Sequence, residues 1–68
     1  MSRRWHNVEL DAKIRINGHS DSGDFRKFLL DNGIKYETSA AGSMVHFEVL
    51  VDNDEMDKCD TFLGTFIN

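Results

Sequence analysis

The sequence predicts an α+β domain in which a strand, a helix, two strands and a second helix follow one another. Three observations support this class. Apolar and polar residues alternate in three segments, which is the period of a half-buried strand. Two further segments carry apolar residues at helical spacing. The segment over 40–43 is short and contains Gly42, which predicts that the last two strands form an antiparallel hairpin.

The first strand is predicted over 8–16, because apolar and charged residues alternate there without a break. Asn17-Gly18 is a turn signal that ends it. The apolar face comprises Val8, Leu10, Ala12, Ile14 and Ile16, and the charged face comprises Glu9, Asp11, Lys13 and Arg15.

The first helix is predicted after the polar loop over 19–24. Ser20, Asp21 and Ser22 are residues that favour the N-cap. Asn32-Gly33 is a helix stop, with Gly33 suited to a left-handed conformation and Ile34 placed to pack on the last turn. The apolar side of this helix comprises Phe25, Phe28 and Leu29.

Two more strands are predicted over 34–39 and 44–51, followed by a second helix capped within 52–54. The apolar stripe of this helix comprises Met56, Cys59, Phe62, Leu63 and Phe66. Because a helix joins the first two strands, they should run parallel, with the third strand between them and both helices on one face. We therefore expect a mixed three-stranded sheet. Its plan resembles a ferredoxin-like fold that lacks the last strand, which would leave the first strand as an open edge.

Length and charge restrict the classes of function. We expect one domain over 1–68, with 1–5 as a flexible arm. The net charge of −4 disfavours direct nucleic-acid binding. Cys59 is the only cysteine, which fits a reducing, cytoplasmic compartment. Residues 1–5 are basic, but no apolar run of signal-peptide length follows, and none reaches the length of a membrane span.

The loop over 18–24 contains a histidine, two serines and two aspartates. Neighbouring residues in a loop do not form a catalytic triad, and the spacing lacks the second glycine of a nucleophile elbow. A turn followed by a helix cap is the favoured interpretation. Asp21, Gly23 and Phe25 resemble the ligand loop of ACT regulatory domains. That resemblance implies an alternative function, a small-ligand sensor that uses this loop.

Acidic residues gather at the start of the second helix. A calcium loop beginning at Asp52 would require glycine at its sixth position and glutamate at its twelfth, where Asp57 and Leu63 stand. An acidic helix start that matches the helix dipole is favoured instead. His6 and His46 could be neighbours across the first and third strands, but with Cys59 on the apolar stripe no zinc set is expected. We expect no metal, no cofactor and no catalytic residue.

The sequence therefore predicts a small, acidic, non-catalytic module that binds a protein partner as a regulator or inhibitor. Chains of this composition are common among phage and mobile-element regulators. The contact would use the open edge strand, the open sheet face or the acidic helix, and the first strand could also pair with a second copy to form a homodimer. The residues expected to carry partner binding are Trp5, Glu9, Asp11, Lys13, Arg15, Met44, His46, Asp54, Glu55 and Asp57.

Overall fold

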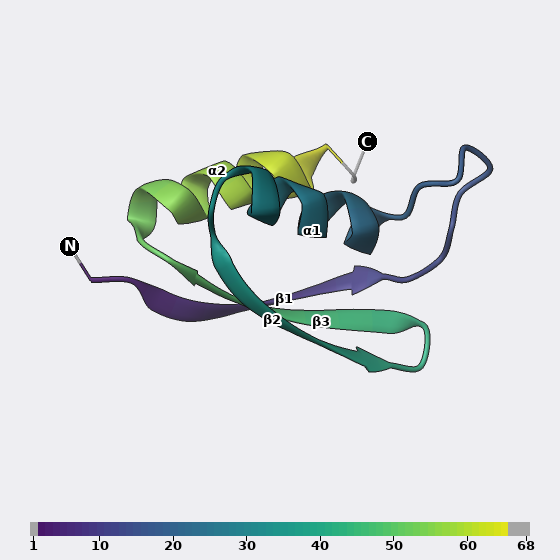
Figure 1. Cartoon of the computed structure of the whole chain (residues 1–68), viewed down its shortest axis with the longest axis horizontal. Coiled ribbons are helices and arrows are strands. Elements are labelled where there is room, and N and C mark those ends of the chain that lie inside the picture. The colour runs from purple at the N-terminus through teal and green to yellow at the C-terminus, as the bar shows by residue number, and fades with distance from the viewer. Residues whose placement is uncertain (1, 66–68) are drawn as a thin grey trace.

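The computed structural model describes residues 2–65, and these form a three-stranded sheet with both helices on one face (Figure 1). The predicted α+β class and element order are confirmed. Along the chain the elements are β1 (Arg4–Asp11), α1 (Asp21–Asp31), β2 (Lys35–Ala41), β3 (Met44–Val51) and α2 (Asn53–Gly64).

The sheet has the order β1-β3-β2, and both of its strand pairs are antiparallel. The prediction of a mixed sheet is therefore wrong. β1 and β2 do run in the same direction, because each is antiparallel to β3. However, β3 separates them, so no parallel pair forms.

The bounds of β1 also differ from the prediction. Alternation predicted a strand over 8–16, whereas β1 begins at Arg4 and ends at Asp11. β3 decides both ends, because Arg4 pairs with Val51 and Asp11 pairs with Met44. The hairpin turn precedes Met44, so the residues after Ala12 have no strand to pair with, and Ile14 forms only an isolated bridge with Ser20. Arg4 and Trp5, expected in a flexible arm, lie within the sheet.

The core lies between the sheet and the two helices. Phe25 and Leu29 of α1 are fully buried, and Phe25 meets Phe47 of β3 edge to face at a ring-centroid distance of 5.0 Å. Cys59 is the buried residue of α2. The stripe residues Met56, Phe62 and Leu63 pack against this core as predicted, and Phe66 lies outside the described residues. The remaining buried apolar residues are Val8, Ile34, Val49 and Val51.

Both helices begin at the predicted caps, and α1 also ends at its predicted stop signal. The Ser20 hydroxyl accepts a hydrogen bond from the Gly23 amide at the start of α1. At its end, the Ile34 amide donates to the Leu29 carbonyl and Gly33 takes a φ of 65°, the arrangement of a Schellman motif. Asp52 and Glu55 form a reciprocal capping box at the start of α2. No helix within residues 2–65 is long and apolar enough to span a bilayer.

Candidate functional site: the open sheet face

The face of the sheet opposite the helices is uncovered by any element within residues 2–65 (Figure 1). Side chains alternate between the two faces of a strand. Val8, Phe47 and Val49 are buried under the helices, so their sequence neighbours point to the open face. These are Trp5, Asn7, Glu9 and Asp11 of β1, Met44, His46, Glu48 and Leu50 of β3, and Lys35, Glu37, Ser39 and Ala41 of β2.

The middle of this face forms a hollow of about 570 Å³. Residues of all three strands line it, so the sheet itself fixes its shape. We call it the acidic hollow, because Glu9, Glu37 and Glu48 are among its lining residues. The other lining residues are Asn7, Thr38, Ser39, Ala41, His46 and Phe47.

Two glutamates of the acidic hollow stand directly opposite each other. Glu37 of β2 and Glu48 of β3 are register partners, and Asn7 of β1 completes the row. Like charges in directly opposite positions destabilise an antiparallel pair. In the next row, His46 Nδ1 lies 3.3 Å from Glu9 Oε1, so His46 offsets the charge of Glu9 when its ring is protonated.

Larger side chains stand at the two ends of the open face. Trp5 is 47 % exposed and pairs with Leu50, which in turn pairs with Lys35. At the other end, Met44 lies between Asp11 and Ala41. The face is thus an acidic centre with an exposed aromatic ring at one end.

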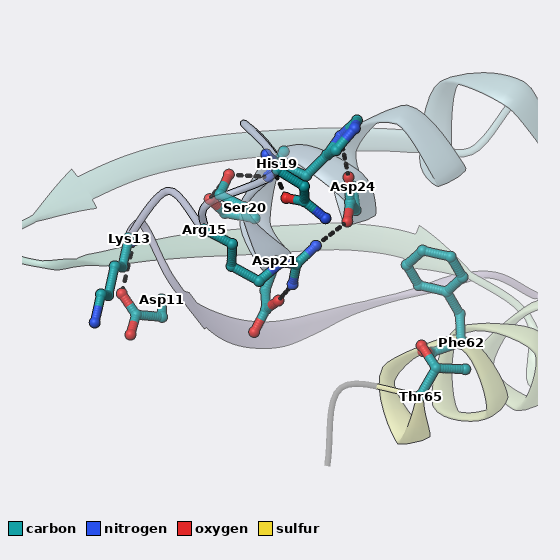
Figure 2. Close-up of polar contacts among 12 residues, drawn as sticks. Asp11, Lys13, Arg15, His19, Ser20, Asp21, Asp24, Phe62 and Thr65 are labelled. Carbon is teal, nitrogen blue, oxygen red and sulfur yellow. Dashed lines mark hydrogen bonds and ion pairs between the residues drawn. The ribbon is translucent and has the colours of Figure 1, made fainter. Parts of the chain in front are cut away.

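Five of the residues predicted to bind a partner share this face: Trp5, Glu9, Asp11, Met44 and His46. Lys13 and Arg15 do not, and their expected placement is wrong, because β1 ends at Asp11 before it reaches them. The Lys13 amide instead donates to the Asp11 carboxylate at 2.8 Å. Figure 2 shows both basic residues on the loop between β1 and α1.

Arg15 holds that loop against the start of α1. Its guanidinium donates to the Asp21 and Asp24 carboxylates, the latter at 2.7 Å (Figure 2). His19 Nδ1 lies 3.4 Å from Asp24, and Ser20 caps the helix. The polar side chains of the 18–24 loop that suggested a ligand site therefore contact one another.

The acidic start of α2 is separate from the open face, because α2 lies on the other side of the sheet. Glu55 is engaged in the capping box and accepts a hydrogen bond from Arg3 Nε at 2.9 Å. This hydrogen bond, followed by Coulomb attraction to Glu55 and Asp52, raises the pKa of Arg3. Asp54 and Asp57 are exposed.

The three histidines lie at separate places in the fold. His6 points to the helix side of β1, where it pairs with Val49, whereas His46 is on the open face. The prediction that His6 and His46 could be neighbours is therefore wrong. Within residues 2–65, no three His, Cys, Asp or Glu side chains form a group that could hold a metal ion.

Burial raises the pKa of the Cys59 thiol, and the nearby Asp60 and Glu55 carboxylates raise it further.

Glu37 and Glu48 are absent from the residues that the sequence predicted to bind a partner. Their pairing depends on the length of the hairpin turn. Ala41 pairs with Met44, so the turn contains only Gly42 and Ser43, and this register brings Glu37 opposite Glu48. A two-residue turn is the signal that could have revealed the pair.

No family model, curated protein or solved structure matches this chain.

Proposed function

We propose that this chain is a non-catalytic protein-binding module whose open sheet face binds a basic segment of a partner protein. The observation that carries this proposal is the acidic hollow, in which Glu37 and Glu48 stand directly opposite each other. Such a pair opposes folding of the free protein. A cation bound between the two carboxylates would turn the repulsion into attraction.

The chemistry of the face favours arginine as the residue that binds there. A guanidinium can donate to carboxylates in a bidentate manner, which an ammonium does not match. Trp5 offers an exposed ring at the end of the face, where a second cation could stack. The net charge of −4 would also speed the approach of a basic partner.

The role is that of a regulator or inhibitor acting in a cytoplasmic compartment. The buried free thiol of Cys59 is consistent with a reducing environment. We also propose that the fold follows the ferredoxin-like plan without its last strand, whose place would lie beside β1. β1 then offers a second contact surface, suited to a homodimer.

The alternative of a small-ligand sensor built on the 18–24 loop is less well supported. Arg15 forms ion pairs with both Asp21 and Asp24, and the Ser20 hydroxyl accepts a hydrogen bond from the Gly23 amide. A ligand would have to displace these contacts, whereas a cation entering the acidic hollow would relieve an existing repulsion.

The proposal is tested by titrating the protein with a fluorescent arginine-rich peptide and measuring anisotropy at several salt concentrations. We expect binding that weakens as salt rises, and a loss of about tenfold in affinity when Glu37→Gln and Glu48→Gln are combined. Asp54→Asn with Asp57→Asn is the matched control, because it removes the same charge from α2. Equal losses in the two double variants would show that the peptide responds only to net charge and would reject the acidic hollow as the site.

A further inference from the structure

β1 presents an unpaired backbone edge. It is the first strand in the order β1-β3-β2, so only one of its sides faces β3. The Ala12 amide, next after β1, donates to the Ser43 carbonyl of the hairpin turn at 2.8 Å. Because backbone groups alternate in direction along an antiparallel strand, the amides and carbonyls of Trp5, Asn7 and Glu9 point to the free edge. Such an edge is a template for another strand.

The charges along this edge differ between its two ends. Arg3 lies just before β1 and Arg4 is its first residue, whereas Glu9 and Asp11 stand at its end. An antiparallel strand of the same sequence places the acidic end of one copy beside the basic end of the other. The other edge strand, β2, has no such division, because its last four residues, 38–41, carry no charged side chain.

We infer that β1 pairs with β1 of a second copy in an antiparallel register centred on Asn7. This inference rests on the proposed role of β1 as a contact surface, and it specifies the partner and the register. Two registers would align the two strands about their middle, one centred on Asn7 and one on Val8. The register centred on Asn7 places Arg3 opposite Asp11, the last residue of β1 in the second copy. The register centred on Val8 places Arg3 opposite Lys13, which lies beyond the end of β1 and carries the same charge.

The pairing joins two three-stranded sheets into one sheet of six strands. Trp5 then stands opposite Glu9 of the second copy, and Asn7 opposite its own equivalent. Asn7 and Glu9 line the acidic hollow, so the two hollows come to lie next to each other on one continuous face. A partner with two basic segments could then occupy both.

Disulfide trapping tests the register. Residues that face each other in a hydrogen-bonded antiparallel pair have Cα atoms about 5.5 Å apart, within the range that a disulfide spans. We expect Asn7→Cys to give a disulfide-linked dimer under mild oxidation, seen on a non-reducing gel. Glu9→Cys is the matched control, because its two introduced thiols would be offset by four positions, roughly 13 Å along the strand. The parent chain, whose Cys59 is buried, controls for other thiols.

Charge exchange tests the contact without a covalent bond. Arg3→Asp alone and Asp11→Arg alone each create two like-charge contacts in the dimer, and we expect each to weaken dimerisation by roughly tenfold in sedimentation equilibrium. The double variant restores opposite charges and should recover the affinity of the parent. Since Arg3 also contacts Glu55, this recovery separates a dimer contact from a structural one.

A chain that remains monomeric at millimolar concentration, with no trapping of Asn7→Cys, would overturn the inference. Trapping of Glu9→Cys at the expense of Asn7→Cys would overturn the register. Neither result depends on the arginine peptide, whose binding is measured separately. Failure of the dimer and failure of the acidic hollow are therefore distinguishable.

Discussion

At the scale of single residues, the acidic hollow gives a prediction about stability. Glu48 faces Glu37 across the hairpin, so removal of one charge should stabilise the free protein. We expect Glu48→Gln to raise the free energy of unfolding by roughly 0.2–1 kcal/mol in urea denaturation, the range of cross-strand pair effects. The exposed Asp57→Asn on α2 should stay within about 0.5 kcal/mol of the parent. A less stable Glu48→Gln would mean that Glu48 makes a favourable contact that outweighs the repulsion.

Cys59 supplies a second prediction at this scale, concerning pH. Burial raises the pKa of its thiol in the folded state, so the unfolded chain loses this proton first as pH rises. The contribution to stability is therefore full below about pH 8.5 and is lost as pH rises through the folded-state pKa. Urea denaturation between neutral and alkaline pH should show a steeper decline for the parent than for Cys59→Ala. Equal slopes in the two proteins would contradict the predicted role of the thiol.

At the scale of elements, the two ends of β1 show what local sequence determines. Alternation correctly assigned Glu9 and Asp11 to the open face, because the face of a side chain depends only on its parity along the strand. It continued wrongly to Ile16, because a strand also needs a neighbour, and β3 provides none beyond Met44. The partners of Glu37 likewise depend on the length of a turn elsewhere in the chain.

The position of residues 14–16 outside the sheet can be tested by measuring the free energy of unfolding of two variants. Ile14 and Ile16 are 69 % and 109 % exposed, whereas Leu29 is fully buried. We expect Ile16→Ala to change the free energy of unfolding by less than about 0.5 kcal/mol, and Leu29→Ala to lower it by about 2–5 kcal/mol. If the strand extended to Ile16 in solution with its side chain in the core, the two substitutions would cost similar amounts.

At the scale of the whole molecule, the small core and the open edge are connected. A chain of 68 residues buries a modest fraction of its surface, so a second copy bound at β1 would contribute noticeably to its stability. If β1 pairs with itself, each tenfold rise in chain concentration should add about 0.7 kcal/mol per chain, half the free energy of a tenfold change in a dimerisation equilibrium. For a domain of this size that corresponds to a rise of roughly 3–6 °C in Tm.

Differential scanning fluorimetry over a range of concentrations would measure this dependence. Asp11→Arg should flatten it, because the variant places like charges opposite each other at both ends of the paired strands. The arginine peptide should raise Tm in both proteins, since the carboxylates of Glu37 and Glu48 remain. A parent protein whose Tm is independent of concentration would mean that the monomer is stable by itself, and that the charges at the two ends of β1 do not hold two copies together.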